Sequence, residues 1–329
     1  MRDRAETTAI RVVAPARLHL GFLDLNGDIG RMFGSIGLAI NTPVTEIVVR
    51  RSAVDHASGI EADRATTALG KLRHWIDLPG GFDVTVERAI PAHAGLGSGT
   101  QIALAVATAA LALSRDRRSS ELIGSLTHRG QRSAIGIAAF EQGGFIVDGG
   151  KGVSEEPPPV LIRAPFPEDW RVILVLDPSA TGVHGDRETR AFAALPPMPR
   201  ATAAHLCHLV LMQAAPALIE IDIARFGAAI TEIQHIVGEH FAAAQGGSAW
   251  SNPKVGQIIQ KLQERGARGQ GQSSWGPTGF AFAESEKLAS TLYHSLVEDA
   301  KAQGLELMIV AGRNAGARIE TQTIAEIGQ

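Results

Sequence analysis

The sequence predicts a two-domain protein that contains both helices and strands, and three observations carry this prediction. Short β-type runs such as Arg171–Asp177 alternate with longer helical segments such as 100–113. A chain of 329 residues is long for a single domain. Glu155–Pro159 ends in three consecutive prolines, which neither a helix nor a central strand tolerates. We therefore place the domain boundary there, with one domain over 1–158 and the other over 159–329.

Residue periodicity and turn-forming residues define the elements of the first domain. Phe82–Arg88 alternates apolar and polar residues and predicts a half-buried strand. Asn41–Pro43 separates two further strand-like runs, so we expect an interruption between them. The elements expected before the boundary are strands over 10–14, 38–40, 45–50, 82–88 and 143–150 and helices over 66–76, 100–113, 119–130 and 131–141.

Beyond the boundary, Arg171–Asp177 predicts a buried strand because it is a short and almost continuous apolar segment. A second glycine-rich element, Gly269–Gly279, precedes the predicted strand Phe280–Phe282. The other elements expected here are helices over 201–215, 220–244, 253–265 and 285–303 and a closing strand over 305–311.

Composition and charge exclude several classes of protein. The net charge is −3 with both signs mixed along the chain, and aromatic residues make up 5%, so we expect no nucleic-acid partner. The charged N-terminus has no apolar segment behind it, and the longest apolar run, Ile102–Leu113, is too short to span a bilayer. We therefore expect no secretion signal and no membrane partner. The single cysteine, Cys207, indicates a reducing compartment, and we predict a cytoplasmic protein.

The most informative segment is the glycine-rich stretch Pro91–Gln101, which leads directly into an alanine-rich helix. Its glycines lack the Cβ atoms that would hold a ligand away from the backbone, and the first N–H groups of the helix stay free at the positive end of its dipole. This pattern favours a phosphate or pyrophosphate site. A glycine-rich turn before a core helix is the alternative. The residues expected to bind pyrophosphate are Gly95, Leu96, Gly97, Ser98, Gly99, Thr100 and Gln101.

Three segments in the same order resemble the three motifs of the GHMP kinase superfamily: Ala14–Asp24, the glycine-rich stretch, and Gly271–Thr278. The resemblance implies an α+β fold of two domains. The N-terminal one would be like ribosomal protein S5 domain 2 and would bind phosphate and substrate, and the C-terminal one would be ferredoxin-like. The positions that match the central motif of the superfamily are Pro91, Gly95, Leu96 and Ser98.

In detail the chain is similar to one divergent branch of that superfamily, the β-ribofuranosylaminobenzene 5′-phosphate synthases. The resemblance implies a decarboxylating phosphoribosyltransferase of tetrahydromethanopterin biosynthesis. In that reaction a ring carbon of 4-aminobenzoate or 4-hydroxybenzoate attacks C1 of phosphoribosyl pyrophosphate, and CO₂ and pyrophosphate leave. It also implies Mg²⁺ without an organic cofactor, small-molecule substrates and a homodimer. The segments that carry it are Arg17–His19, Asp24–Arg31, Gly37–Ile40, His93–Gln101, Gly136–Gly150 and Gly271–Thr278.

Two departures from the kinase pattern weigh against phosphoryl transfer. Kinases of the superfamily place an aspartate after the second motif, where this chain has the apolar run Gly136–Phe140. The second serine of their glycine motif, which helps to hold Mg²⁺, is Gly99 here. Phosphoryl transfer depends on the metal and on a positioned nucleophile. An ATP-dependent small-molecule kinase is therefore our alternative hypothesis, and a metabolite-binding protein without activity is a third.

Four residues are candidates for catalysis. Arg17 and His19 project from the same face of an extended segment and form a coherent pair for an anionic substrate. Asp24 belongs to the first motif. His93, two residues before the first loop glycine, is placed to bind phosphate or to act as an acid. Each has a structural alternative, namely a salt bridge, a packed histidine or a turn cap.

Other polar residues are candidates for metal and substrate binding. Asp24 and Asp148 carry the carboxylate oxygens that Mg²⁺ prefers. His184 and Arg187 belong to a glycine-flanked loop, and loops often carry binding groups. The ring of Trp275 either stacks on a benzoate or packs between the domains. The full set expected to bind substrate is Arg31, Glu141, His184, Arg187, Ser273, Ser274, Trp275 and Gly276.

Overall fold

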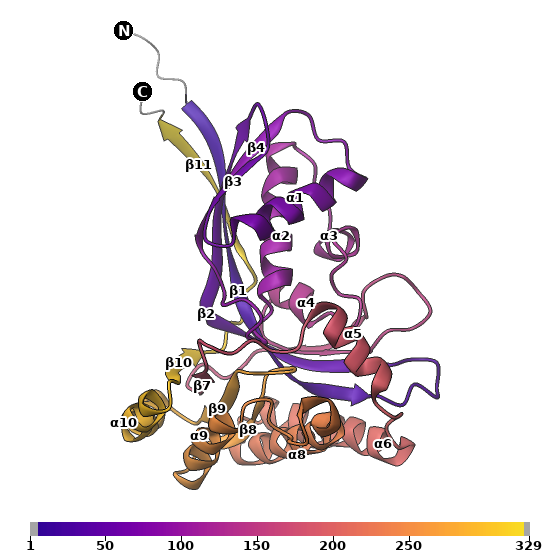
Figure 1. Ribbon diagram of the computed structural model, residues 1–329, viewed down its shortest axis with the longest axis vertical. Coiled ribbons are helices and arrows are strands. Elements are labelled where there is room, and N and C mark those ends of the chain that lie inside the picture. The colour runs from indigo at the N-terminus through magenta and orange to yellow at the C-terminus, as the bar shows by residue number, and fades with distance from the viewer. Residues whose placement is uncertain (1–5, 326–329) are drawn as a thin grey trace.

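The computed structural model describes residues 6–325 of the chain (Figure 1). Its first part is a long, mostly antiparallel sheet with helices against one face. The elements of this part are β1 (Glu6–Asp24), β2 (Phe33–Ser52), β3 (His56–Gly59), α1 (Ala62–Trp75), β4 (Gly81–Arg88), α2 (Ser98–Leu113), α3 (Ser120–Leu126), α4 (Ile135–Glu141), β5 (Phe145–Asp148) and β6 (Val160–Ala164).

The second part is a smaller antiparallel sheet with strand order β10-β7-β9-β8 and helices around it. The last strand, β11 (Arg318–Ala325), returns to the first sheet. The remaining elements are β7 (Arg171–Leu176), α5 (Gly185–Ala194), α6 (Arg200–Leu209), a π-helical turn (Val210–Ala214), α7 (Ala215–Ile219), α8 (Ile223–Phe241), a 3-10 turn (Ala242–Gln245), α9 (Pro253–Glu264), β8 (Arg268–Gln272), β9 (Gly279–Ala283), α10 (Glu286–Ala302) and β10 (Glu306–Ala311).

Helix α2 is the central helix of the first part. It contacts β1 and β2 on one side and α1, α3 and α4 on the others, so residues from Gln101 to Leu111 are almost all buried. Alanine suits this position because its helix propensity is high and its small side chain lets neighbouring elements approach closely. The burial of α2 fixes its N-terminus, and with it the glycine-rich loop, against the sheet.

Helices and other core residues cover both faces of the smaller sheet. On β7, Val172 and Leu174 belong to the core that includes α8. Ile173 and Val175 face the opposite way and pack in the core that includes α9 and α10. Successive side chains of a strand point to opposite faces, so a continuous apolar strand indicates two covered faces.

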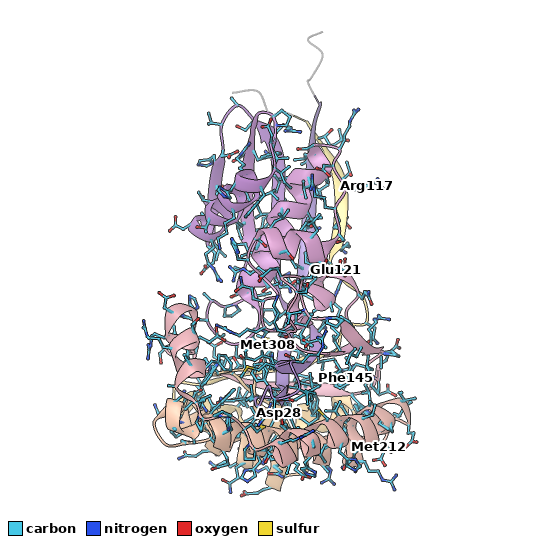
Figure 2. All side chains as sticks on the ribbon, turned by 90° about the vertical axis from the view of Figure 1, so that its right-hand side faces the viewer. Asp28, Arg117, Glu121, Phe145, Met212 and Met308 are labelled. Carbon is cyan, nitrogen blue, oxygen red and sulfur yellow. The ribbon has the colours of Figure 1, made fainter. Side chains whose placement is uncertain are left out.

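An aromatic cluster joins the two parts. Phe226 of α8 is fully buried, and its ring centroid lies 5.8 Å from that of Phe145 on β5 and 5.3 Å from that of Phe282 on β9. The rings of Phe166 and Trp170, in the connection between β6 and β7, complete the cluster. Figure 2 shows Phe145 at the level where the two parts meet. This shared core holds the parts together.

The structure departs from the sequence predictions mainly in the length and number of strands. Strand β2 runs through Asn41–Pro43, and these three residues bulge out of the ladder with β1, which pairs Pro15 with Val44 and Ala16 with Ile40. The predicted helices over 119–130 and 131–141 are shorter, at α3 and α4. Elements that we did not predict are β3, β6, α5, β8 and β11.

Strands from both predicted segments contribute to the first sheet. Strand β6 pairs with β5, and β11 pairs with β1, although both lie beyond residue 158. The run Pro157–Pro159 precedes β6 and therefore lies between two strands of the same sheet. The division into 1–158 and 159–329 remains a prediction about the sequence, while the first sheet as a spatial unit contains residues from both sides of it.

One helical stretch, Arg200–Ile219, has the length and composition of a membrane-crossing helix, with a mean hydropathy of 1.4. In its most apolar window, 44% of the residues are buried inside the protein. Leu206 and Leu209 pack in the same core as α8. A core helix passes the same test, so this stretch is weak evidence for a membrane. The absence of a membrane partner stays a prediction.

Replacing the centre of the aromatic cluster should destabilise the whole chain. We expect Phe226→Ala to lower the free energy of unfolding by about 3–5 kcal/mol, because it leaves a cavity between both sheets. Urea unfolding followed by circular dichroism measures this loss. The control is Trp75→Ala, whose side chain is 55% exposed and whose expected effect is about 0.5 kcal/mol or less. Equal losses in the two variants would contradict a shared core centred on Phe226.

Candidate functional site

The glycine-rich loop keeps its shape through its own backbone. Gly95 and Gly97 have φ angles of +77° and +84°, which glycine adopts without strain. The Gly97 carbonyl accepts hydrogen bonds from the N–H groups of Thr100 (3.0 Å) and Gln101 (3.2 Å) at the start of α2. No side chain from the described part of the chain caps this helix end. The N–H groups of Ser98 and Gly99, which precede these two, are therefore available to a ligand.

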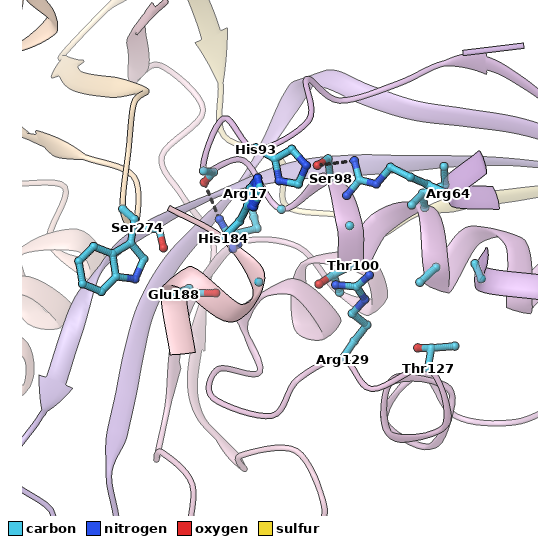
Figure 3. A pocket seen from close by; sticks show the side chains of 18 of the residues that line it. Arg17, Arg64, His93, Ser98, Thr100, Thr127, Arg129, His184, Glu188 and Ser274 are labelled. Carbon is cyan, nitrogen blue, oxygen red and sulfur yellow. Dashed lines mark hydrogen bonds between the residues drawn. The ribbon is translucent and has the colours of Figure 1, made fainter. Parts of the chain in front are cut away.

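A pocket of about 510 Å³ opens beside this loop (Figure 3). Among the described residues, four cationic side chains line it together with His93 and His184, whereas Glu188 is the one carboxylate of this lining. The loop contributes Gly95, Gly97, Ser98, Gly99 and Thr100, and the third motif contributes Ser274, Trp275 and Gly276. The four cations are Arg17, Arg64, Lys71 and Arg129. This balance of charge suits a ligand with several negative charges.

Arg17 of β1 lies against the loop. Its Nη1 donates a hydrogen bond to the Gly95 carbonyl at 2.6 Å, and its side chain approaches the place where a Cβ of Gly97 would lie. Burial lowers the pKa of the Arg17 guanidinium to about 10, and Glu188 opposes this shift. Arg17 therefore remains a cation at neutral pH in a partly buried position.

The rings of the two pocket histidines contact each other, although the residues belong to different segments. Their ring centroids are 3.5 Å apart, with His93 in the loop and His184 directly before α5. His93 has a φ of +56°, and its carbonyl accepts a hydrogen bond from the N–H of Gly182 at 2.8 Å. Desolvation, His184 and Arg64 together lower the pKa of His93, and Glu61 opposes them. Both histidines, which the sequence analysis named as candidate site residues, thus lie in the pocket lining.

The third motif anchors the loop. The hydroxyl of Ser273 donates to the Gly95 carbonyl at 2.6 Å and accepts a hydrogen bond from the N–H of His19 at 2.9 Å. Trp275 is 2% exposed, and its indole stacks on Phe241 with a centroid distance of 4.1 Å. Its burial and its contact with Phe241 support a packing role. Stacking of Trp275 on a substrate ring stays a prediction.

His19 lies in the core behind the pocket rather than in its lining. It is 3% exposed, its ring lies 4.4 Å from that of Phe22, and neither ring nitrogen has a hydrogen-bond partner in the described structure. Burial, with a contribution from Arg17, lowers the pKa of His19 to about 3. The histidine is therefore neutral throughout the physiological range. Its role in catalysis stays a prediction that this placement does not support.

Three predicted carboxylates lie outside the lining and bind backbone groups. Asp24 accepts hydrogen bonds from two N–H groups of the turn that follows β1, at 2.7 and 2.9 Å. Asp148 is fully buried and accepts four hydrogen bonds, three from backbone N–H groups and one from the Ser133 hydroxyl. Glu141 accepts from the N–H of Ser120 at 3.2 Å. Each therefore has a clear structural role.

Five further candidates also lie outside the lining, among them Ser273, whose hydrogen bonds anchor the loop. Arg31 donates to the Gly150 carbonyl at 2.8 Å, and Gln101 donates to the Gly136 carbonyl at 2.8 Å. Leu96 is buried, and Arg187 is exposed on α5. Their assignments as binding residues stay predictions.

The residues present do not fit a resident Mg²⁺ ion. Within residues 6–325, no group of three or more His, Cys, Asp or Glu side chains is arranged to hold a metal. Asp24 and Asp148 use their oxygens for backbone N–H groups, and neither lines the pocket. Mg²⁺ is bound by oxygen ligands, several of which come from phosphate in phosphate-binding sites. Among the described residues, the pocket lining provides one carboxylate, that of Glu188, beside hydroxyl groups such as those of Ser98 and Thr100.

Relatives of known name match almost the entire chain. A protein of Methanothermobacter thermautotrophicus named β-ribofuranosylphenol 5′-phosphate synthase is 34% identical over 92% of this chain and 96% of its own length. A protein of Archaeoglobus fulgidus with the same name is 33% identical over 94% of this chain and 99% of its own. The chain belongs to the β-ribofuranosylphenol 5′-phosphate synthase family. Residues 63–144 and 214–302 also match the GHMP kinase N-terminal and C-terminal domains, which confirms the resemblance found in the motifs.

Solved structures confirm the α+β GHMP-type fold for this synthase family member. A homoserine kinase from Cytophaga hutchinsonii superposes with a TM-score of 0.66 at 16% identity, covering 95% of this chain and 97% of its own. A mevalonate diphosphate decarboxylase from Staphylococcus aureus superposes with a TM-score of 0.65 at 19% identity, covering 95% and 98%. At these identities the likeness shows the fold alone.

Sequence reasoning missed three of the four pocket cations. Arg64 and Lys71 lie seven residues apart on α1, and Thr67 and Ala68 between them also line the pocket. This i, i+3, i+4, i+7 spacing marks one face of a helix and was the available signal. Arg129 follows α3 in a turn and belongs to no motif. Only the fold brings it to the glycine-rich loop.

The buried His19 should make stability depend on pH. Its pKa is about 3 when folded and 6.5 in the ordinary state, so the unfolded chain takes up a proton below about pH 6.5 that the folded chain does not. This pKa difference leaves the free energy of unfolding unchanged above pH 6.5 and lowers it by about 1.4 kcal/mol for each pH unit below that value. Urea unfolding at pH 7, 6 and 5 measures the slope. His19→Leu should remove this part of it, and identical slopes in both proteins would contradict the assignment.

Proposed function

We propose that this chain is a β-ribofuranosylphenol 5′-phosphate synthase that condenses 4-hydroxybenzoate with phosphoribosyl pyrophosphate. The relatives' name specifies a phenol product, which favours 4-hydroxybenzoate over 4-aminobenzoate as acceptor. A cytoplasmic homodimer that acts in tetrahydromethanopterin biosynthesis completes the proposal on the strength of family resemblance.

The observation that carries the proposal is the charge of the pocket beside the glycine-rich loop. Four cationic side chains and one carboxylate line a space of about 510 Å³. Phosphoribosyl pyrophosphate carries a phosphate at one end and a diphosphate at the other, and the acceptor adds a carboxylate. Arginine binds such groups through paired N–H donors, and a helix N-terminus favours them further. A small neutral substrate would leave most of this positive charge unbalanced.

The reaction places modest demands on the protein. Pyrophosphate leaves C1 of the ribose with the electron pair of the C–O bond. The ring carbon that bears the carboxylate forms the new C–C bond, and loss of CO₂ returns the electron pair of the broken bond to the ring. Cations that stabilise the departing oxygens accelerate the first of these steps. The pocket supplies them without any redox group.

Mg²⁺ enters this proposal with the substrate rather than with the protein. Structures of related fold include a complex of magnesium, mevalonate diphosphate and a nucleotide analogue. In the present chain the pocket offers one carboxylate, Glu188, so the diphosphate itself would provide most of the oxygen ligands. No step of the proposed reaction is assigned to a protein-bound metal.

The alternative, an ATP-dependent small-molecule kinase, has less support. It rests on structural neighbours whose low identity shows the fold alone. In the region where kinases place their aspartate, α4 buries the apolar run Gly136–Phe140. Glu141, which ends that helix, is bonded to the N–H of Ser120. A positioned nucleophile therefore has no carboxylate to orient it there.

A substrate-dependent release of CO₂ tests the proposed function. We expect purified protein with Mg²⁺, phosphoribosyl pyrophosphate and carboxyl-labelled 4-hydroxybenzoate to release labelled CO₂, with slower release from 4-aminobenzoate. Counting the trapped gas measures the rate, and omission of either substrate is the control. A folded protein that releases none, or that instead consumes ATP with a metabolite, would refute the synthase.

Arg17 should contribute strongly to the use of the substrates. We expect Arg17→Ala to lower kcat/KM by about 10- to 100-fold, since a charge-assisted hydrogen bond in a desolvated site contributes about 1.5–3 kcal/mol. The control is Arg225→Ala, an exposed arginine on α8 outside the pocket. Steady-state kinetics of CO₂ release compare the two. Unchanged kinetics in a folded Arg17→Ala protein would remove Arg17 from the site.

A further inference from the structure

Arg64 and Arg129, two cations of the pocket, meet at Gly99, and Figure 3 shows their side chains beside the start of α2. A Cβ built on Gly99 would lie 2.8 Å from Nη2 of Arg64 and 3.1 Å from Nη1 of Arg129. Lys71, two turns along α1 from Arg64, lines the same space. The absence of a side chain at Gly99 thus lets two guanidinium groups approach the first turn of α2.

The negative charge around these three cations is insufficient to balance them. Glu61 pairs with Arg64 at 3.3 Å. Within residues 6–325, neither Lys71 nor Arg129 forms a salt bridge, and Nε of Arg129 is buried without a hydrogen-bond partner. Glu188, the carboxylate of the pocket lining, pairs with Arg132 at 3.1 Å. Like charges that converge in a partly desolvated space repel each other unless an anion lies between them.

The pKa values of the cluster agree with this repulsion. Burial lowers the pKa of the Arg129 guanidinium, and the nearby charge of Arg64 lowers it further. Burial also lowers the pKa of Lys71, with a further contribution from Arg129. The Arg17 side of the pocket differs, because Glu188 there raises the pKa of the cation that it faces. The pocket therefore has a strongly positive end at Gly99 and a more balanced end at Arg17.

We propose that Arg64, Lys71 and Arg129, together with the first turn of α2 at Gly99, form the diphosphate subsite of this pocket. The inference rests on the proposed function and adds an orientation to it. The most highly charged group of phosphoribosyl pyrophosphate lies at the end with three cations. The ribose 5′-phosphate and the acceptor lie toward Arg17.

Inorganic pyrophosphate is the probe, because its binding needs no turnover. Isothermal titration calorimetry in buffer without divalent metal should give a dissociation constant that rises by about tenfold or more in Arg129→Gln and in Lys71→Gln, the loss expected for one charge-assisted bond. Lys287→Gln removes the same charge from the exposed surface of α10 and should change it less than about twofold. Arg17→Gln should weaken pyrophosphate less than Arg129→Gln does.

A second pair of variants tests position without changing charge. Gly99→Ala places a methyl group between the two guanidinium groups, and its backbone needs no positive φ, so the variant should fold. Gly70→Ala on the exposed side of α1 meets nothing within 4 Å and is the matched control. We expect Gly99→Ala to weaken pyrophosphate by about tenfold and Gly70→Ala to leave it unchanged.

The outcomes separate this inference from the proposed function. Weak pyrophosphate binding in Arg129→Gln, Lys71→Gln and Gly99→Ala, with the controls unaffected, supports the subsite even if the wild-type protein releases no CO₂. In that case the synthase proposal fails alone. Pyrophosphate that binds equally well to all variants, that fails to bind the wild type, or that depends on Arg17 as much as on Arg129 overturns the subsite, whatever the wild-type activity.

Discussion

The site depends on the close approach of three chain segments at Gly95. Its carbonyl accepts one hydrogen bond from Arg17 of β1 and another from the Ser273 hydroxyl of the third motif, both at 2.6 Å. A Cβ at Gly95 would lie 2.3 Å from the Ser273 carbonyl oxygen, so a side chain there would force the segments apart. His19 donates its N–H to the same serine. Leaving one of these buried groups unpaired costs about 1–3 kcal/mol. These hydrogen bonds keep the glycine-rich loop, β1 and the third motif together beside the pocket.

Much of the fold follows from local sequence signals, and the remainder depends on distant partners. Helix α2 and strands β4 and β7 were predictable because their periodicity reflects their own burial. Strand β8 was not, because its sequence, Arg268–Gln272, is polar and glycine-rich and forms a strand only by pairing with β9. Helix α5 has no buried residue, so its sequence lacks the apolar stripe that would have predicted a helix. Where tertiary contacts supply the reason for an element, the sequence alone carries little sign of it.

The candidate site was predictable in its backbone and less so in its side chains. The glycine-rich loop, Arg17 and His93 line the pocket and were candidates because each lies in a segment that resembles a motif of the superfamily. Arg64 and Arg129 reach the pocket from separate helices and turns, and an arginine on a helix face resembles any solvated charge. Conversely, Asp148 resembled a metal ligand, although its four hydrogen bonds secure a turn. The residue type alone does not show whether a side chain points into the pocket or binds the protein's own backbone.

The pairing of β11 with β1 bears on the order in which the chain acquires its structure. Val13 lies opposite Arg318, so residues from the two extremes of the sequence share one ladder of hydrogen bonds. During synthesis, the early strands emerge long before their partner exists, and the edge of β1 must wait for the final residues. Closing so long a loop is entropically costly and contributes a high contact order. The first sheet thus cannot be complete until residues 318–325 have been made.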